Sequence, residues 1–485
     1  MDIKKYLQNI DEVIEKGEYK DTWESLSAYR VPDWYADSKF GIFIHWGVYS
    51  VPAFGNEWYS RNMYIQGSEE YEHHLRTYGA HKDFGYKDFI PLFKAEKFSA
   101  DEWLDLFQSA GAQYIVPVAE HHDGFQMYKS EISKWNAYEM GPRRDIVGEL
   151  SEAAKKRGII NGASSHRAEH WFFMGHGREF ESDITDSEKY GDFYYPAMPE
   201  PSDLQDLFSS PEPSQEYLED WLVRCCEIVD RFQPRIVYFD WWIQHSAVKP
   251  YLRKFAAYYY NRAGEWGGGV INYKHDAFMF GTAVVDIERG QFADVKPFIW
   301  QTDTAIAKNS WCYTENNSYK KPGAIICDLI DIVSKNGRLL LNVGPKADGT
   351  FSDEDRSILM EIGRWLRTNK EAVYGAKVWR QSSEGPTRIQ EGQFTDNEDR
   401  NYTEKDIRFT VNHGCLYAAV MKYPADGSVT IESLGKLSQF CGMIRDVSVL
   451  GFDERPAFSR DDKGLHIHTE SVRSEYPVVL KIVMD

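Results

Sequence analysis

A repeating order of helix and apolar strand places the strongest limit on how this chain can fold. Helical stretches are predicted from the capping pattern at residues 99–102, and over about residues 146–156, 215–231 and 324–334. Each is followed within a few residues by a short apolar run that ends in polar residues. Continuous apolar strands alternating with helices are typical of a parallel sheet covered on both faces. The predicted strands lie within residues 40–47, 113–119, 159–165, 235–239, 270–275 and 338–345.

This many helix–strand units in about 340 residues favours a closed (β/α) barrel of the TIM type. An open doubly wound sheet is the second choice, because the glycine pattern of a dinucleotide-binding fold is missing after the early strands. Eight clean units are not visible, and residues 170–215 read as a long loop. The barrel is nevertheless the prediction that accounts for most of the chain.

The pattern changes after about residue 375, where helical periodicity stops. Residues 407–411 and 415–420 flank Asn412-His413-Gly414 and read as a hairpin. Further short strands are predicted at 428–431, 447–450, 465–468 and 478–483, which suggests a smaller C-terminal β-sandwich. We therefore predict three parts: a helical lead-in over 1–30, a catalytic (β/α) barrel over 31–374 and a β-sandwich over 375–485.

Composition narrows the class of partner. Lys and Arg number 56 against 75 Asp and Glu, and the resulting net charge of −19 disfavours nucleic acid and anionic membranes as partners. A neutral substrate fits better, and the 15 Trp and 30 Tyr suit sugar-binding clefts, although most of these rings must fill the core. The six cysteines form no metal-type pair, and the start of the chain is polar. A cytoplasmic protein with reduced thiols is expected.

Polar residues stand at the ends of the predicted strands, where barrel enzymes carry their catalytic groups. They are His45, Glu120, His121, His122, His166 and Asp240, and Glu288 is a further candidate because it follows another apolar stretch at residues 284–287. Asp240 follows a wholly apolar strand, so it is a nucleophile, a general base or half of a buried ion pair. Glu288 could face Asp240 across the barrel mouth, but a surface salt bridge with Arg289 is the simpler alternative. Glu57, flanked by aromatic residues, suits either a sugar pocket or an anchored loop.

The histidines also admit a metal site. His45, His121, His122, His166 and His170 could supply ligands to zinc. However, neighbouring residues of a strand point to opposite faces, and no HExxH helix is present. The preferred interpretation is that these imidazoles bind sugar hydroxyls, with no metal and no cofactor required.

Taken in order along residues 30–370, several segments resemble glycoside hydrolase family 29, the α-L-fucosidases. The segments are residues 34–47, Glu57-Trp58-Tyr59, 121–125, Tyr238-Phe239-Asp240, Trp311-Cys312-Tyr313 and 336–345. The resemblance implies a (β/α) barrel followed by a β-sandwich, and hydrolysis of terminal α-L-fucosides with retention through a fucosyl-enzyme. The implied partner is a fucosylated oligosaccharide, and a homo-oligomer stays open.

The resemblance also implies residue roles. Asp240 stands where the family has its nucleophile, and Glu288 looks like the general acid/base. The implied substrate-binding residues are His45, Trp46, Glu57, Trp58, His121, His122, His166, Tyr238 and Trp241.

Three segments depart from the family pattern and leave alternatives open. Residues 164–171 replace a Tyr-rich strand end, Trp241-Trp242 follows the nucleophile where Gly is common, and Trp300-Gln301 replaces Trp-Glu. The last change removes a rival for the acid and favours Glu288. The first two put linkage preference in doubt, so an α-L-galactosidase or a transfucosylase remains an alternative. From another class, a non-catalytic fucose-binding protein would not need both carboxylates.

Overall fold

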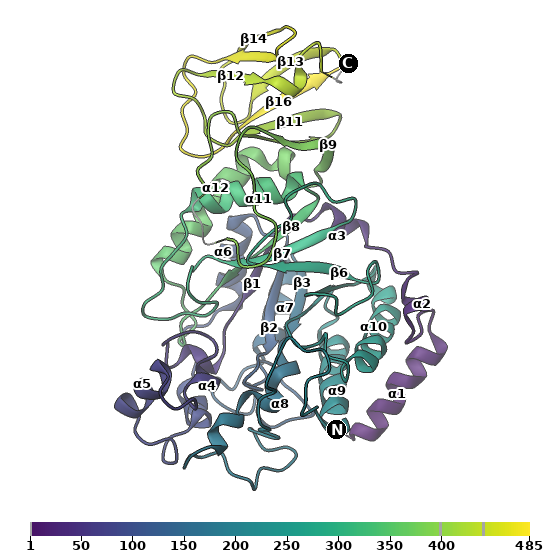
Figure 1. Cartoon of the computed structure of the whole chain (residues 1–485), viewed down its shortest axis with the longest axis vertical. Helices are drawn as coiled ribbons and strands as arrows, with labels where there is room; N and C mark the ends of the chain where they lie inside the picture. The colour runs from purple at the N-terminus through teal and green to yellow at the C-terminus, as the bar shows by residue number, and fades with distance from the viewer. Residues whose placement is uncertain (1, 397–399, 439–441) are drawn as a thin grey trace.

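The computed structural model describes residues 2–396, 400–438 and 442–485. Its centre is a closed barrel of eight parallel strands, which confirms the predicted (β/α) barrel (Figure 1). The strands are β1 (Phe40–Ile44), β2 (Tyr114–Glu120), β3 (Ile160–Ser165), β4 (Ile236–Phe239), β5 (Val270–Tyr273), β6 (Val284–Glu288), β7 (Trp300–Ala305) and β8 (Gly337–Val343). Their inward side chains, such as Phe43, Val116 and Leu340, form a packed core rather than a pore.

Helices cover the outside of most of the barrel. They are α6 (Ala100–Ala110), α7 (Ile146–Arg157), α9 (Gln215–Phe232), α10 (Lys249–Ala263), α11 (Pro322–Ser334) and α12 (Asp353–Val373). The Ser99 side chain accepts a hydrogen bond from the Glu102 amide at the start of α6, as the capping pattern predicts. The fully described stretches 274–283 and 289–299 hold no helix, so β5, β6 and β7 follow one another through loops alone. None of the helices in the described chain is long and apolar enough to cross a membrane.

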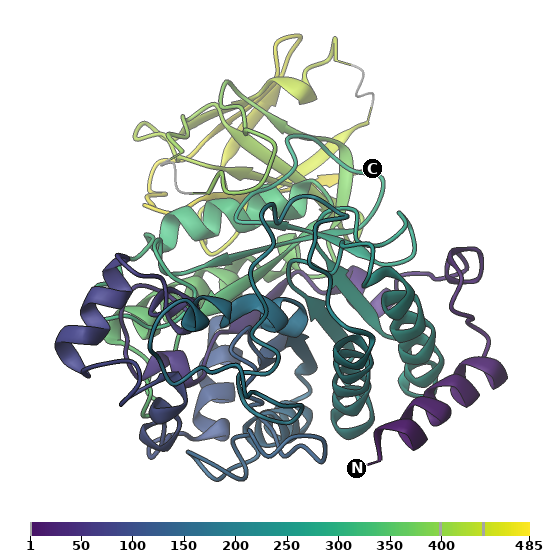
Figure 2. The same cartoon turned by 60° about the horizontal axis from the view of Figure 1, so that its bottom comes forward.

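The N-terminal residues pack on the outside of the barrel. The helix α1 (Ile3–Lys16) buries Ile10 and Ile14 and lies beside α9 and α10, as the purple and teal helices show in both views (Figure 1, Figure 2). The Tyr6 hydroxyl donates a hydrogen bond to Asp230 on α9. Two short helices, α2 (Trp23–Leu26) and α3 (Asp33–Asp37), connect this helix to β1.

The C-terminal part is built from two antiparallel sheets that share one core, as the β-sandwich prediction requires. The strands are β9 (Lys377–Glu384), β10 (Ile407–Asn412), β11 (Cys415–Val420), β12 (Ser428–Ile431), β13 (Ile444–Val449), β14 (Ala457–Arg460), β15 (Leu465–His468) and β16 (Val478–Met484). One sheet has the order β13-β16-β11-β10-β9 and the other β12-β15-β14. Leu416 and Leu480 of the first sheet pack with Ile431 and Ile467 of the second.

A buried ion pair, a hydrogen bond and apolar contacts join the two parts. Asp331 on α11 pairs with Arg408 of β10 and with Lys335 at the end of its own helix, and all three side chains are buried. The Trp365 indole on α12 donates to the Pro477 carbonyl at 2.8 Å. Removing one partner of such a buried pair leaves an uncompensated charge, so separating the sandwich from the barrel at this point is unfavourable.

Candidate active site

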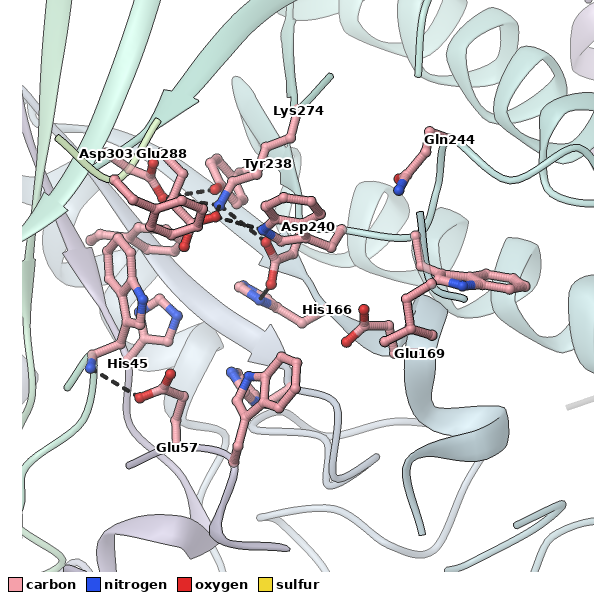
Figure 3. A pocket seen from close by; sticks show the side chains of 18 of the residues that line it. His45, Glu57, His166, Glu169, Tyr238, Asp240, Gln244, Lys274, Glu288 and Asp303 are labelled. Atoms are coloured by element: carbon pink, nitrogen blue, oxygen red, sulfur yellow. Dashed lines mark hydrogen bonds and ion pairs between the residues drawn. The ribbon is translucent and has the colours of Figure 1, made fainter. Parts of the chain in front are cut away.

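A cavity of about 360 Å³ opens at the carboxyl ends of the barrel strands (Figure 3). Parallel strands meet at this end, so residues distant in sequence converge there. Nine of the predicted site residues line the cavity: His45, Glu57, Trp58, His121, His166, Tyr238, Asp240, Trp241 and Glu288. The polar residues predicted at the strand ends thus mostly meet in one pocket.

Asp240 lies at the centre of this pocket, directly after β4. Its Oδ2 atom is 2.9 Å from His166 Nδ1 and 3.3 Å from His122 Nε2, and its Oδ1 atom is 3.2 Å from Lys274 Nζ. Burial alone would raise the pKa of Asp240, but the ammonium and the two imidazoles outweigh it and hold that pKa well below its ordinary value. The carboxylate is therefore ionised at neutral pH, as a nucleophile must be.

Lys274 links the carboxylates of the site and is not among the predicted site residues. It follows β5, is almost fully buried, and lies 2.5 Å from Glu288 and 3.5 Å from Asp303 in addition to Asp240. Burial would lower its pKa, but these carboxylates raise it well above the ordinary lysine value. Lys274 is thus a permanent cation between three acids.

Glu288 is the last residue of β6 and faces Asp240 across Lys274. Burial and the charges of Asp303 and Asp240 raise its pKa to about 7 against the opposing effect of Lys274. The Trp241 indole donates to its Oε2 atom at 2.5 Å. The alternative of a surface salt bridge with Arg289 is wrong: Glu288 is buried and bound to Lys274 instead, whereas Arg289 pairs with Asp396.

The spacing of the two carboxylates suits double displacement. One nitrogen, Lys274 Nζ, lies 3.2 Å from an Asp240 oxygen and 2.5 Å from a Glu288 oxygen. These two oxygens are therefore no farther apart than the sum of the two distances. That limit is close to the roughly 5–5.5 Å of retaining glycosidases and well short of the roughly 6.5–9.5 Å of inverting ones.

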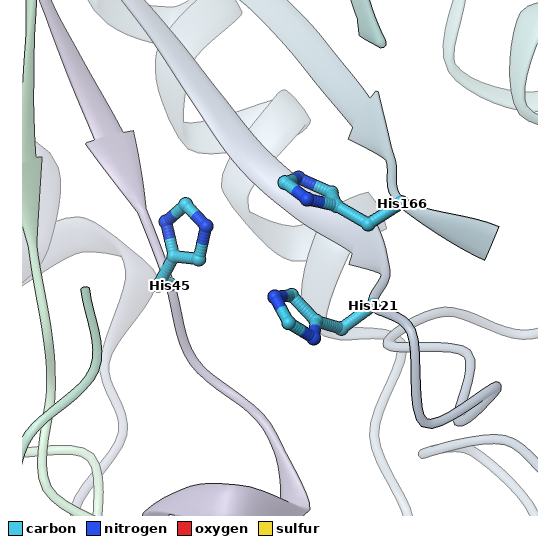
Figure 4. Close-up of side chains that lie close together, drawn as sticks. All are labelled: His45, His121 and His166. Carbon is cyan, nitrogen blue, oxygen red and sulfur yellow. The ribbon is translucent and has the colours of Figure 1, made fainter. Parts of the chain in front are cut away.

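Three buried histidines line the side of the pocket nearest β1, β2 and β3 (Figure 4). His45 Nδ1 lies 2.7 Å from Asn342 Oδ1, and the second nitrogen of His166 lies 3.0 Å from the Ser164 hydroxyl. Burial lowers the pKa of His45 and of His121 well below the ordinary value, and lowers that of His166 as well. Neutral imidazoles can both donate and accept, which suits sugar hydroxyls.

The same three imidazoles place one nitrogen each within 4.8 Å of one another, so a metal ion must be considered. Both nitrogens of His166 already have partners, Asp240 and Ser164. We expect exhaustive dialysis against EDTA to leave glycosidase activity unchanged, with calcium-saturated EDTA as the control. A loss that added Zn²⁺ or Mn²⁺ restores would contradict the metal-free interpretation.

Glu57 and Trp58 come from the segment that follows β1 and line the pocket. Glu57 Oε2 accepts a hydrogen bond of 2.9 Å from the Trp311 amide, which fixes the carboxylate while it lines the cavity. The Trp58 ring makes edge-to-face contacts with the rings of His122 and Phe173. Both residues therefore belong to the pocket rather than to a separate loop anchor.

Two of the strand-end residues have other contacts. His122 does not line the cavity; its ring bridges Glu169 at 3.2 Å and Asp240 at 3.3 Å. Burial alone would lower the pKa of His122, but these carboxylates raise it. Glu120 is used in a buried ion-pair network, at 2.7 Å from Arg167 and 3.1 Å from Arg224.

The substrate-binding prediction for Trp46 does not fit the structure. Its ring lies outside the cavity, packed against Phe98 and Trp103, and its indole donates to the Lys346 carbonyl. The physical reason is the strand alternation: His45 points into the barrel mouth, so the next side chain points outward toward α6.

Several residues that line the pocket are absent from the predicted catalytic and substrate-binding set. They are Phe43, Glu169, Leu204, Gln205, Trp242, Gln244, Lys274, Asp303, Trp311 and Phe394. Lys274 follows a predicted strand and could have been read from its end, as Asp240 was. Phe394 comes from a loop beyond the barrel, and no local signal in the sequence points to it.

Comparison with known proteins agrees with this geometry. The family model "Alpha-L-fucosidase" matches residues 6–371, and "Alpha-L-fucosidase C-terminal domain" matches residues 399–483. Human plasma alpha-L-fucosidase is 32% identical over 423 residues, which cover 84% of this chain and 80% of that protein. Human tissue alpha-L-fucosidase is 31% identical, with 93% and 87% covered.

A solved structure extends the likeness to three dimensions. The α-fucosidase of Thermotoga maritima, crystallised with fucose, is 30% identical with a TM-score of 0.73 and covers 96% of this chain and 100% of its own. The barrel with two carboxylates at its mouth and the C-terminal sandwich agree with what these relatives indicate. The chain belongs to the α-L-fucosidases of glycoside hydrolase family 29.

Proposed function

We propose that this protein hydrolyses terminal α-L-fucosides with retention, with Asp240 as nucleophile and Glu288 as general acid/base. The observation that carries the proposal is the pair of carboxylates on either side of Lys274, one ionised and one with a pKa of about 7. Environments that push two carboxyl groups apart in pKa assign them different roles. The identity of the substrate sugar as fucose is inferred from the fucosidase relatives.

In the first step an Asp240 oxygen attacks the anomeric carbon while the bond from that carbon to the glycosidic oxygen breaks. The Glu288 proton passes to the departing oxygen, and a fucosyl ester of Asp240 forms. In the second step ionised Glu288 removes a proton from water, and the water oxygen displaces Asp240. Two inversions give net retention, and both residues return to their starting protonation states.

The histidines and Lys274 support these steps without entering them. His122 and His166 contact Asp240 Oδ2, which limits rotation of the carboxylate and keeps it aimed at the anomeric carbon. His45, His121 and Glu57 line the same part of the cavity and offer hydrogen bonds to ring hydroxyls. Lys274 lowers the pKa of both catalytic carboxyls, which keeps Asp240 ionised next to Glu288.

The proposal is tested by following an aryl α-L-fucoside by proton NMR. The first product observed should be α-L-fucose, before mutarotation produces the β-anomer. The aryl α-L-galactoside serves as a parallel substrate, and a faster rate on it would move the assignment to L-galactose. Binding of fucose without turnover would favour the non-catalytic alternative.

Replacing Lys274 should damage the reaction and shift its pH profile. Lys274→Met leaves Asp240, Glu288 and Asp303 without their shared cation. Lys274 lowers the pKa of both catalytic carboxyls, so its removal should shift both limbs of the kcat/KM profile to higher pH. The loss of preorganised charge should lower kcat/KM by about 10²-fold or more, ~2.7 kcal/mol.

The matched control for that variant is Lys254→Met, which removes a partly exposed lysine from a surface pair with Asp11. It should leave the profile unchanged. A Lys274→Met enzyme that loses activity with both limbs in place would show that the ammonium does not set the pKa of either catalytic carboxyl.

A cytoplasmic location is also part of the proposal. The described cysteines, Cys225, Cys226, Cys312, Cys327 and Cys415, are all free, which suits a reducing compartment. Cys441 lies outside the described residues. Fractionation of the source cells with an antibody to the protein tests the location.

A further inference from the structure

A segment from beyond the barrel reaches back to the mouth of the active site. Between β9 and β10 the chain lies against the end of β6. The Phe394 amide donates to the Glu288 carbonyl at 2.9 Å, and the Thr395 amide donates to the Arg289 carbonyl at 2.8 Å. Gly392 pairs with Gln291 in an isolated bridge. The backbone of the acid/base residue is thus attached directly to the C-terminal part of the protein.

The two segments approach so closely that most side chains would not fit between them. A Cβ atom on Gly290 would lie 1.8 Å from the Gly392 carbonyl oxygen, so only glycine allows this approach. Arg289 and Phe394 both have positive φ, 44° and 55°, which is unfavourable for such side chains. The buried Asp396 holds the strained segment through Lys320, Thr304 and Arg289. Strain of this kind persists where surrounding contacts enforce it, commonly at functional sites.

The strained position puts an aromatic ring in the open wall of the pocket. Phe394 lines the active-site cavity, yet 55% of it is exposed, so it contributes little to a core. Its ring is nearly parallel to Trp241, at 6.3 Å and 15°, and Trp241 in turn packs on His275. An exposed ring held in an unfavourable backbone conformation is better explained by a ligand than by stability.

The chemistry at Glu288 identifies the ligand. Trp241 donates to Glu288 Oε2, and Glu288 must protonate the oxygen of the leaving group. The leaving group therefore lies beside Trp241 and Phe394. The fucose ring lies deeper, among Asp240 and the histidines. The two nearly parallel rings offer apolar faces, which suit the C–H face of a pyranose.

We propose that Phe394 and Trp241 form the subsite for the first sugar ring of the leaving group. The C-terminal segment thereby contributes to aglycone recognition. This inference rests on the proposed function, because Glu288 locates the leaving group only if it is the acid. The ligand class is a hexopyranose or an N-acetylhexosamine attached directly to fucose.

The test compares two substrates that share the fucosyl group. One is α-L-fucosyl fluoride, whose leaving group has no ring. The other is the fucosyl disaccharide that the wild-type enzyme cleaves fastest from a panel of linkages. Phe394→Ala should lower kcat/KM on the disaccharide about tenfold and change it less than about twofold on the fluoride. Phe394→Tyr, which keeps the ring, should retain the wild-type rate on both.

A structural role is separated by two further measurements. If Phe394 only positioned Glu288, the basic limb of the pH profile would move in Phe394→Ala. We expect that limb to be unchanged, and the inhibition constant of the free leaving-group sugar to be about tenfold weaker with the fluoride as substrate. The matched control is Phe458→Ala, another exposed phenylalanine, on β14 of the sandwich. It should behave as wild type.

Each remaining outcome is decisive. Equal losses on the fluoride and the disaccharide, or no loss on either, would overturn the subsite while leaving the fucosidase proposal intact. A wild-type enzyme that cleaves neither substrate would overturn the proposed function, and the subsite with it.

Discussion

Asp240→Gly is expected to lower the hydrolysis of an aryl α-L-fucoside by about 10⁴-fold, ~5.5 kcal/mol of transition-state stabilisation. Among the described residues, the carboxylate is the only acid of the pocket that contacts His122, His166 and Lys274 together. These contacts hold it ionised. Without it the fucosyl-enzyme cannot form.

Azide should restore turnover of this variant, because the glycine leaves room for a small anion where the carboxylate stood. A single displacement by azide inverts the anomeric carbon, so the product should be β-L-fucosyl azide. Asp453→Gly makes the same substitution at an exposed position of the sandwich and should have wild-type activity. Appreciable hydrolysis by Asp240→Gly without azide would contradict the nucleophile assignment.

The class of fold follows from local rules that each segment obeys by itself. The helix that starts at Ser99 has its cap, its buried face and its left-handed Gly111 at the end, and all of these can be read from the sequence. The strand before Asp240 is a continuous apolar run, as a doubly covered sheet requires. Agreement between propensity and tertiary structure made these elements predictable.

The sixth and seventh barrel strands were harder to predict for a physical reason. β6 alternates buried and half-buried residues, and β7 is largely polar, with Gln301 and Asp303 in its buried run. No helix lies between β5 and β7 in the fully described stretch 274–299 to mark the units. Gln301 donates to Asp286 and Asp303 accepts from Tyr238 across the barrel interior. These contacts are long-range, so eight units could not be counted from sequence patterns.

The same difference between local patterns and long-range contacts explains which site residues could be predicted. Asp240 and the histidines stand at strand ends, where topology alone brings residues together. Lys274 matters because three carboxylates surround it, and only the closed barrel shows this. Glu288 was open to a surface interpretation with Arg289 because sequence adjacency says nothing about burial. Phe394 reaches the pocket from the C-terminal part, which no periodic pattern could indicate.

Glu288→Ala is expected to separate substrates by their leaving groups. A fucosyl disaccharide, whose leaving oxygen needs a proton, should lose about 10³-fold in kcat/KM, ~4 kcal/mol. The 2,4-dinitrophenolate of a dinitrophenyl fucoside leaves as a stable anion without a proton. Formation of the fucosyl-enzyme should therefore be nearly unchanged, and its hydrolysis should be slow. The fucosyl-enzyme should then accumulate and appear as a burst of dinitrophenolate.

The pH dependence of kcat/KM tests whether Glu288 acts as the acid. Glu288 acts as an acid only while protonated, and its pKa is raised to about 7. Wild-type kcat/KM on the disaccharide should therefore fall as the pH rises through about 7, and this basic limb should be absent in Glu288→Ala. Glu265→Ala, at an exposed glutamate outside the pocket, should keep the limb.

Azide distinguishes the two carboxylates directly. In Glu288→Ala the nucleophile is intact, so azide attacks the fucosyl-enzyme and a second inversion gives α-L-fucosyl azide, the opposite anomer to that from Asp240→Gly. A uniform loss across the disaccharide and the dinitrophenyl substrate, with no burst, would mean that Glu288 serves only to hold Lys274 and Trp241. The two azide products together then decide which carboxylate bonds to the sugar and which one moves the proton.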